Sequence, residues 1–441
     1  MPVFMTIAAK GSGKRILQNG GWLLAAKSVG ALLSLVYLAL IARSLGPELF
    51  GGFALMFSFA QIVAGIAAFQ TWQLLIRYGT QPLIDKQHGL LAKLLMLCLG
   101  LDIASVLLGT ALAAIGILLL AGPFGWSAGA QQILFALTVI LLLSSRSTPT
   151  GLLRLFDNFK LAALIDALVP ILRFFGVLLV YFTGPNVTGY LIIWVLSEAV
   201  PTIVIWGFVL AQRRFPLADV NPMHWRLYAA SFQGFFRYAL WSSLGSTLRL
   251  LNQQVIVVIV GLFATVEAAG FFRLGHQLGQ VLARIADGIA LAFFVEFARV
   301  DAVHGDTKAQ PLIGKTLALT LLSAAAILLI LLAAGRPILA WVFGDDYLPA
   351  FPFIMLLGAA AAVQIGAIAF EPVLMSRGYA GRVILAHLAG AVTMVILLAA
   401  LLPKSTGLSA GLGAGAAALG GALVSAAAMA VAYRHSNRNI K

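Results

Sequence analysis

Six polar side chains lie on one face of an apolar segment in the second half of the chain. Successive members are three, one, three, four and three residues apart, which at about 100° per residue keeps them on one narrow face of a helix. They are Arg273, His276, Gln277, Gln280, Arg284 and Asp287. A charge at the centre of a bilayer costs about 2.5 to 3.5 kcal/mol, so this face requires a wet cavity or a polar partner.

The preceding apolar segment has a second polar face, formed by Ser242, Gly245, Ser246, Arg249, Asn252 and Gln253. Together the two segments present a cationic, amide-rich surface. Guanidinium groups hold phosphate oxygens with bidentate geometry and stay charged at any physiological pH. We therefore predict a cavity for an anionic molecule, such as a lipid-linked sugar phosphate. The alternative is a buried network in which Arg284 and Asp287, or Arg249 and its neighbours, neutralise each other.

The first half of the chain carries weaker polar faces. Lys27 shares a face with Ser34 and joins the candidates for cavity lining. Asp102 shares a face with Ser105 and Gly109, and it lies within an apolar segment. A mid-membrane carboxylate of this kind is a candidate for ion coupling or for an ion pair.

The same two roles apply to the other acidic residues of the apolar segments. The full set is Asp102, Asp166, Glu198, Asp287 and Glu371. Asp166 lies seven residues before Arg173 on the same helix face, which predicts an ion pair between them or across helices. Glu198 has no basic residue within a helical turn, so we expect it to carry a proton or to pair with a cavity arginine. Glu371 shares a face with Gln364 and lies close enough to a segment end to be hydrated.

The sequence contains no pattern typical of catalysis or of cofactor binding. We find no Walker-type phosphate loop, no nucleophile elbow and no zinc motif. No two histidines have the spacing typical of metal ligands. Cys98 is the single cysteine and lies in an apolar segment, which predicts a packed thiol. We therefore expect a protein that is not an enzyme, with no catalytic residues, no metal and no cofactor.

The composition places the chain in a membrane. Of its 441 residues, 61% are hydrophobic and 10% are charged, far from the balance of a water-soluble domain. Because a membrane helix needs about 20 apolar residues, the apolar segments predict an all-α membrane protein with twelve spans. They cover roughly 16–41, 51–76, 90–121, 130–152, 161–182, 188–211, 236–262, 268–293, 312–334, 351–375, 382–402 and 407–432.

The basic residues predict the orientation of these spans. Lys and Arg collect on alternate loops, which accounts for most of the net charge of +14 without a nucleic-acid partner. Both termini are therefore expected in the cytoplasm. The opposite loops are short, as at Gly46-Pro47-Glu48, and leave little soluble mass on the outer side.

An internal repeat divides the chain into two halves. Four residues recur at an offset of 219 (270 − 51 for the glycines), and two more recur at 223 (372 − 149). The pairs are Trp22/Trp241, Glu48/Glu267, Gly51/Gly270, Gln61/Gln280, Pro149/Pro372 and Arg154/Arg377. Since six spans separate the copies, we predict two parallel six-helix lobes around a central cavity, working by alternating access. The lobes cover 1–211 and 238–441, and 212–237 is a cytoplasmic linker with an interfacial helix.

One turn also resembles a known family. The segment Ala42-Arg43-Ser44-Leu45-Gly46-Pro47-Glu48-Leu49-Phe50-Gly51 is similar to the ARxLGPExFG turn of oligosaccharide flippases in the multidrug/oligosaccharidyl-lipid/polysaccharide exporter superfamily, and a weaker twin covers 265–272. The resemblance implies a V-shaped pair of bundles in the bacterial inner membrane that moves undecaprenyl-pyrophosphate-linked oligosaccharides to the periplasmic leaflet. Such units feed O-antigen, capsule or exopolysaccharide assembly, with polysaccharide-assembly proteins as partners.

The resemblance also implies roles for individual residues. Arg249 and Arg273 are the expected contacts of the pyrophosphate or of an acidic sugar. Many relatives carry an acidic residue near Asn252, and its absence argues against ion coupling through that helix. We expect a monomer, because an internal duplication removes the usual need for a dimer.

Three alternatives remain. A cation-coupled multidrug exporter of the same superfamily would need an acidic cavity, and the excess of arginine argues against it. A peptidoglycan-precursor flippase typically has fourteen spans, whereas twelve are predicted here. A membrane glycan polymerase or ligase would need a large outward loop, which the short loops do not provide.

Overall fold

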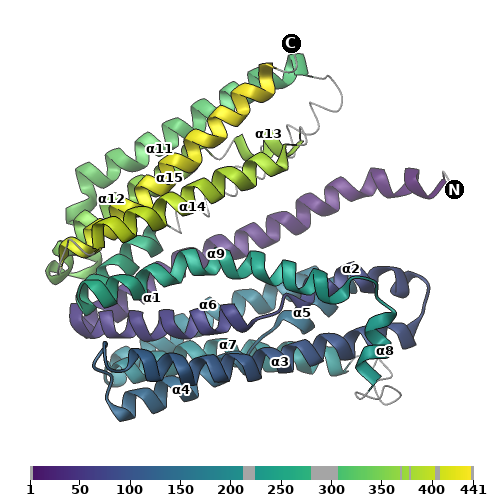
Figure 1. The fold of residues 1–441 in the computed structure, drawn as a ribbon, viewed down its shortest axis with the longest axis horizontal. Helices are drawn as coiled ribbons and strands as arrows, with labels where there is room; N and C mark the ends of the chain where they lie inside the picture. The colour runs from purple at the N-terminus through teal and green to yellow at the C-terminus, as the bar shows by residue number, and fades with distance from the viewer. Residues whose placement is uncertain are drawn as a thin grey trace. The chain divides into compact units, whose positions relative to one another are not determined.

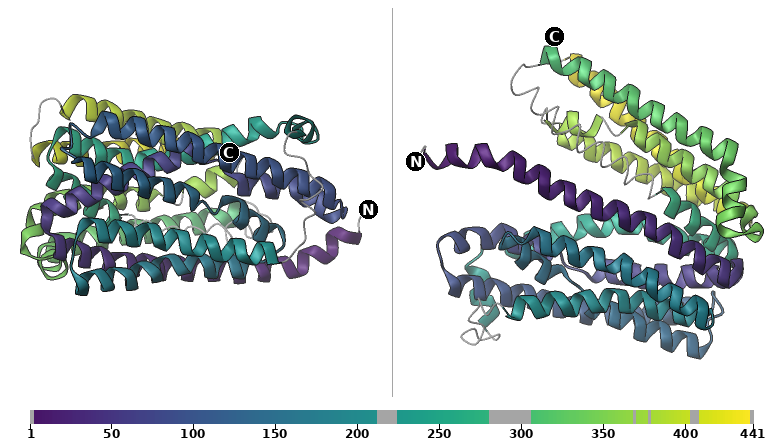
Figure 2. Two further views of the ribbon diagram at one scale, coloured as in Figure 1. Left: turned by 90° about the horizontal axis from the view of Figure 1, so that it is seen from below. Right: turned by 180° about the vertical axis from the view of Figure 1, so that it is seen from behind.

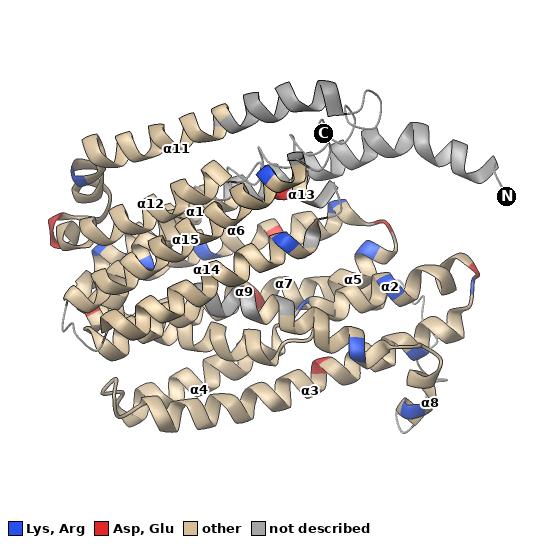
Figure 3. Cartoon of the chain, turned by 45° about the horizontal axis from the view of Figure 1, so that its top comes forward, with Lys and Arg blue, Asp and Glu red and all other residues tan. Residues whose placement is uncertain are grey.

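The computed structural model describes residues 3–211, 224–279, 306–367, 370–376, 379–402 and 408–438. Within these ranges the chain is almost entirely helical and contains no strand (Figure 1). Most of the helix length carries neither acidic nor basic residues (Figure 3). Away from its ends, a helix satisfies its backbone hydrogen bonds internally, as an apolar environment requires.

Seven helices form the first half of the chain. They are α1 (Val3–Ala67), α2 (Thr71–Ile84), α3 (His88–Leu120), α4 (Ala128–Leu143), α5 (Ser147–Leu155), α6 (Phe159–Thr183) and α7 (Val187–Ala211). The second half contains α8 (Trp225–Ala230), α9 (Phe235–Phe263), a helix over 266–279, α11 (Asp306–Phe343), the 3₁₀ helix η3 (Asp345–Ala350), α12 (Phe351–Ala367), α13 (Phe370–Ser376), α14 (Ala380–Leu401) and α15 (Leu408–Arg438).

Most of the described helices are long enough to form the predicted spans. Nine segments of the described residues are long and apolar enough to cross a membrane, and the longest, Gly30–Ile84, contains a turn. Gly46 takes φ 73° and ψ 170° there, a conformation that favours glycine, and Pro47 follows it. The predicted Gly46-Pro47 loop thus separates two passages within α1. The all-α membrane fold with about twelve membrane helices is confirmed, although part of the predicted span 268–293 lies outside the described residues.

Two compact units make up the structure. The first contains residues 1–37 and 56–255, and the second contains 38–55 and 256–441. The boundary falls within α9, and the turn around Gly46 belongs to the second unit. The predicted division into 1–211, 212–237 and 238–441 stays a prediction; of that linker, residues 212–223 lie outside the described residues.

Two apolar clusters hold the first unit together. One joins α2, α3, α5 and α9 through Leu74, Leu95, Leu152 and Phe235. The other joins α1, α3 and α4, and in it the ring centroids of Phe59 and Trp126 are 5.9 Å apart. The helix pairs α3 with α4 and α6 with α7 run side by side (Figures 1 and 2).

In the second unit, the buried ring of Tyr347 in η3 joins several helices. Its hydroxyl donates a 2.7 Å hydrogen bond to the carbonyl oxygen of Ala42. The rings of Phe50, Phe271 and Phe343 have centroids 6.0 to 6.1 Å from that of Tyr347. In the same unit α14 runs beside α15 (Figure 2).

Candidate functional site

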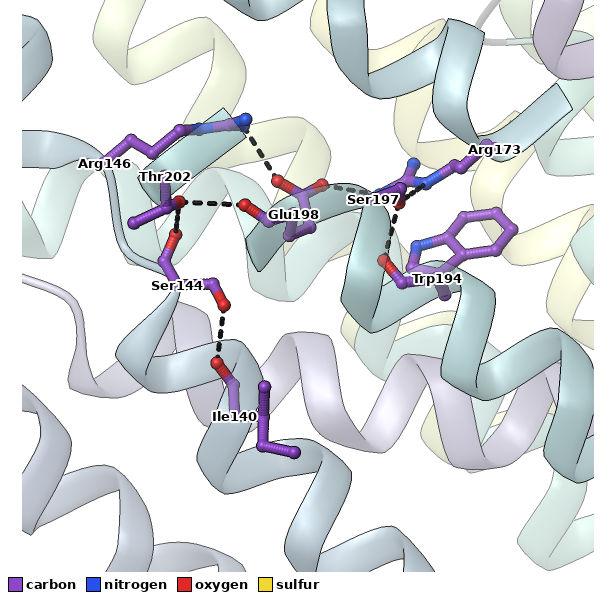
Figure 4. Close-up of polar contacts among 8 residues, drawn as sticks. All are labelled: Ile140, Ser144, Arg146, Arg173, Trp194, Ser197, Glu198 and Thr202. Carbon is purple, nitrogen blue, oxygen red and sulfur yellow. Dashed lines mark hydrogen bonds and ion pairs between the residues drawn. The ribbon is translucent and has the colours of Figure 1, made fainter. Parts of the chain in front are cut away.

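Glu198 of α7 joins two arginines from other helices. Its Oε2 atom lies 2.8 Å from Nη2 of Arg146, and its Oε1 atom lies 2.5 Å from Nη2 of Arg173 (Figure 4). Arg146 comes from the junction between α4 and α5, and Arg173 comes from α6. The side chains of Arg146, Arg173 and Glu198 are 18%, 12% and 19% exposed, so solvent screens these ion pairs little.

Arg173 is held in a defined orientation. Its Nε atom donates a 2.9 Å hydrogen bond to Oγ of Ser197, which itself donates to the carbonyl oxygen of Trp194 at 2.6 Å. The Arg173 guanidinium carbon lies 4.1 Å from the centroid of the Trp194 ring, a cation–π contact. Trp194, Ser197 and Glu198 lie three and four residues apart on α7 and therefore on one face of the helix. Trp194 thus contacts the face of the guanidinium, while Ser197 and Glu198 accept hydrogen bonds from its edge.

Arg146 is held through the backbone near it. The hydroxyl of Thr202 donates to the carbonyl oxygen of Ser144 at 2.7 Å and to that of Glu198 at 2.8 Å, which ties the end of α4 to α7 (Figure 4). The Nη1 atom of Arg146 is buried and has no hydrogen-bond partner among the described residues. A buried guanidinium N–H without a partner is costly, which marks this group as able to bind a further acceptor.

The three ionised side chains carry a net charge of +1. We call Arg146, Arg173 and Glu198, with Ser197 and Trp194, the arginine cluster. Its donors are the planar, bidentate groups that suit phosphate and carboxylate oxygens. The arrangement can therefore bind an anion.

A second polar group surrounds a break between α1 and α2. The backbone N–H groups of Phe69 and Gln70 donate to the hydroxyls of Ser105 (3.3 Å) and Ser243 (3.2 Å). The N–H of Trp72 donates to the hydroxyl of Ser147 at 3.2 Å. Serines of α3, α9 and α5 thus satisfy the donors that a helix start leaves without partners.

Asp102 lies beside this break. The hydroxyl of Thr71 donates to its Oδ1 atom at 3.1 Å, and the hydroxyl of Thr148 donates to the Thr71 oxygen at 2.9 Å. Thr148 follows Arg146 by two residues, so α5 links this group to the arginine cluster. The predicted spans 51–76 and 130–152 were expected to be continuous helices, whereas the structure interrupts both at these points.

The other predicted site residues of the described part lie elsewhere. Arg273 and Gln277 are 6% and 9% exposed, and His276 stacks on Phe272 with centroids 6.4 Å apart; all belong to the helix over 266–279 in the second unit. Asp166 is exposed on α6. Glu371 lies with Oε2 3.5 Å from Nε2 of His387.

Several predicted residues cannot be placed. Gln280, Arg284 and Asp287 lie outside the described residues, as do the side chains of Lys27, Arg249, Asn252 and Gln253. The predicted role of Arg249, Arg273 and Arg284 in holding an anion stays a prediction. Within the described ranges, no group of three or more His, Cys, Asp or Glu residues could hold a metal ion.

The candidate substrate residues predicted from the sequence did not include the arginine cluster. From the sequence, Arg173 is considered only as a partner of Asp166 or of a residue on another helix, and Arg146 receives no role. A signal was present, because Arg146 stands in the polar run Ser144-Ser145-Arg146-Ser147-Thr148 in the middle of an apolar segment. A lone acid and two lone bases on separate membrane helices also require partners across helices.

Comparison with known proteins gives two kinds of match. A family model described as polysaccharide biosynthesis protein matches residues 16–294. The inner membrane protein YghQ of Escherichia coli (strain K12) is 28% identical over 357 residues, which cover 78% of this chain and 97% of that protein.

Two solved structures show the same fold. An inward-facing multidrug-resistance transporter of the MATE family superposes with a TM-score of 0.66 at 16% identity, covering 93% of this chain and 94% of that one. The lipid II flippase MurJ, in an inward closed conformation, gives a TM-score of 0.66 at 12% identity, covering 95% of this chain and 87% of that one.

Proposed function

The chain belongs to the polysaccharide biosynthesis protein family, and from this premise we propose that it is a flippase for undecaprenyl-pyrophosphate-linked oligosaccharides. It moves them from the cytoplasmic to the periplasmic leaflet of the bacterial inner membrane, for O-antigen, capsule or exopolysaccharide assembly. Both termini face the cytoplasm. The family, the inner-membrane relative and the fold shared with MurJ support this proposal.

The observation that carries the proposal is the net positive charge of the arginine cluster. A pyrophosphate group cannot enter the apolar interior of a membrane unless cations and N–H donors replace its water. Arg146 and Arg173 supply two guanidinium groups within hydrogen-bond distance of one carboxylate, together with a buried N–H that has no acceptor in the described part of the chain. The lipid tail meanwhile stays in the bilayer, so only the headgroup needs this polar path.

The broken helices fit a transport mechanism. Membrane transporters commonly form substrate sites at interruptions of helices, where backbone and side chains offer polar groups to a ligand. The first unit has two interruptions, between α1 and α2 and between α4 and α5, and they are joined by the Trp72–Ser147 hydrogen bond. Translocation makes and breaks no covalent bond, so no catalytic residue is required.

A multidrug exporter of the same fold would need a site for organic cations. The arginine cluster has two cations for one carboxylate, which disfavours such a substrate. We therefore keep the lipid-linked oligosaccharide as the substrate.

Proteoliposomes that contain the purified protein and a fluorescent lipid-linked oligosaccharide test this proposal. We expect Arg146→Gln and Arg173→Gln each to slow flipping at least about tenfold, equivalent to about 1.4 kcal/mol. Arg226→Gln removes an exposed arginine of α8 and serves as the control with an unchanged rate. The proposal fails if both cluster variants flip at the wild-type rate, or if the wild type moves an organic cation and no lipid-linked sugar.

A further inference from the structure

The two guanidinium groups that suit a phosphate are already bound to Glu198. Each carboxylate oxygen takes one arginine, at 2.8 Å and 2.5 Å. A pyrophosphate that binds both arginines with bidentate geometry needs the same N–H donors. The substrate and Glu198 therefore compete for one set of hydrogen bonds.

The charges favour an exchange over simultaneous binding. The cluster carries +1 with Glu198 ionised, and a pyrophosphate diester adds about two negative charges at neutral pH. With all groups ionised, the Glu198 carboxylate would face the phosphate oxygens at close range in a poorly screened interior. Like charges in one site disfavour each other, so one of them has to move or become neutral.

The buried N–H of Arg146 favours the pyrophosphate over Glu198 as the partner of the two arginines. Glu198 has two oxygens and uses one on each arginine, which leaves Nη1 of Arg146 without an acceptor among the described residues. A pyrophosphate has more acceptor oxygens and can bind that N–H as well. The substrate can therefore accept a hydrogen bond from Nη1 of Arg146 that the Glu198 carboxylate does not accept.

We propose that Glu198 is the exchangeable counter-ion of this site: the substrate pyrophosphate displaces its carboxylate from Arg146 and Arg173, and the released carboxylate takes up one proton from solution. This inference rests on the proposed function. A carboxylate that has lost both cations in an apolar interior is destabilised as an anion, and protonation makes it neutral. When the substrate leaves, Glu198 returns the proton and binds both arginines again, so the proton balance closes over one cycle.

The other titratable groups around α7 do not replace Glu198 in this role. In the described part of the first unit, the elements packed against α7 carry Arg154 on α5; Lys160, Asp166 and Tyr181 on α6; and Tyr37 on α1, whose ring is 5.6 Å from that of Trp194. Arg154 lies over the ring of Trp72 at 4.8 Å, and Asp166 is exposed. Tyr190 is the further titratable group of α7 itself. Among the residues that the structure describes, only Glu198 is a carboxylate in contact with both cluster arginines.

The test measures protons taken up as an anion binds. Purified protein in nanodiscs is titrated by calorimetry with an undecaprenyl-pyrophosphate-linked disaccharide, a diester whose two phosphates stay ionised near neutral pH. The titration is repeated in buffers of different ionisation enthalpy at one pH. We expect wild type to take up about one proton more per ligand than Glu198→Gln, because the ligand's own protonation is common to both. Glu198→Gln should also bind at least about tenfold more tightly, since no carboxylate competes.

Two variants keep the result interpretable. Asp85→Asn removes an exposed acid whose side chain accepts a hydrogen bond from nearby Gln81, and it should match wild type in both measurements. If Glu198→Gln does not fold, Glu198→Asp keeps the charge on a shorter arm and should bind more tightly than wild type while retaining the proton uptake. Equal proton uptake in wild type and Glu198→Gln, or affinity that is unchanged or weaker in the variant, overturns the exchange.

A parallel titration with inorganic pyrophosphate separates the two proposals. If wild type flips lipid-linked oligosaccharide but Glu198→Gln takes up as many protons as wild type, the function stands and the exchange is wrong. If inorganic pyrophosphate shows the extra proton but lipid-linked oligosaccharide is neither bound nor flipped, the exchange stands and the proposed substrate is wrong. If neither the lipid-linked pyrophosphate nor inorganic pyrophosphate binds, both the proposed function and the exchange are wrong.

Discussion

Gly51 and Gly270 occupy equivalent positions of the internal repeat, and they lie against each other in the second unit. A Cβ atom built on Gly270 would lie 3.0 Å from the Cα of Gly51, and a Cβ on Gly51 would overlap the carbonyl oxygen of Val266. The two backbones approach so closely that neither position has room for a side chain. The repeated glycines are therefore explained by one contact that uses both copies.

We expect Gly51→Ala to destabilise the protein. The added methyl group overlaps backbone atoms, which cannot change rotamer as a side chain can. We therefore expect the free energy of unfolding to fall by about 1 to 3 kcal/mol. Gly52→Ala is a matched control, because a Cβ there has no neighbour within 4 Å. Thermal unfolding in detergent should show a lower Tm for Gly51→Ala and an equal or higher Tm for Gly52→Ala. Equal Tm values for both variants would show that the contact is looser than described.

Tyr347→Phe should destabilise the second unit. The change leaves the carbonyl oxygen of Ala42 without the 2.7 Å hydrogen bond of the buried hydroxyl, while the ring keeps its contacts. Loss of one intramolecular hydrogen bond costs about 0.5 to 1.5 kcal/mol. The same measurement on Tyr181→Phe, at a less buried ring of α6, provides the control. A Tm for Tyr347→Phe no lower than that of the control would mean that water replaces the lost donor.

Arg173→Lys should impair transport although it keeps the charge. A lysine ammonium cannot reproduce the planar group that bonds Ser197 and Glu198 and stacks on Trp194 at once. We expect about tenfold slower flipping in proteoliposomes, with the protein still folded. Arg226→Lys, in exposed α8, should flip at the wild-type rate. Full activity of Arg173→Lys would show that only the charge matters at this position.

Thr71→Val should weaken the junction of α1 and α2. The variant keeps the shape of the side chain but removes the hydrogen bond to Asp102 and the acceptor used by Thr148. Because Thr71 is fully buried, we expect a loss of about 1 to 3 kcal/mol of stability, read as a lower Tm. Thr80→Val removes an exposed hydroxyl that donates to the carbonyl oxygen of Ile76 in its own helix, and it should change the Tm little. Similar Tm values for the two variants would contradict a structural role for the Asp102–Thr71–Thr148 chain.

The fold could be predicted from local sequence because its signals are local. A run of about 20 apolar residues indicates a membrane helix whatever surrounds it. Gly46-Pro47 indicates a turn through the conformational preferences of the two residues themselves. The helix interruptions at Phe69 and Ser145 carry no such mark, since neither a glycine nor a proline stands at them. Their donors are satisfied by serines from other helices, and only the folded arrangement supplies those partners.

The candidate site, like the fold, could be predicted from the sequence only in part. That Glu198 needs a partner or water follows from its place in an apolar segment, because an ionised carboxylate is costly in hydrocarbon whichever helices surround it. Which partner it takes does not follow, since Arg146 and Arg173 are 52 and 25 residues away along the chain. Composition and periodicity thus determined the all-α membrane fold and its paired halves. Tertiary structure decided which charges meet, because an ion pair depends on the distance between side chains of separate helices and not on their spacing in sequence.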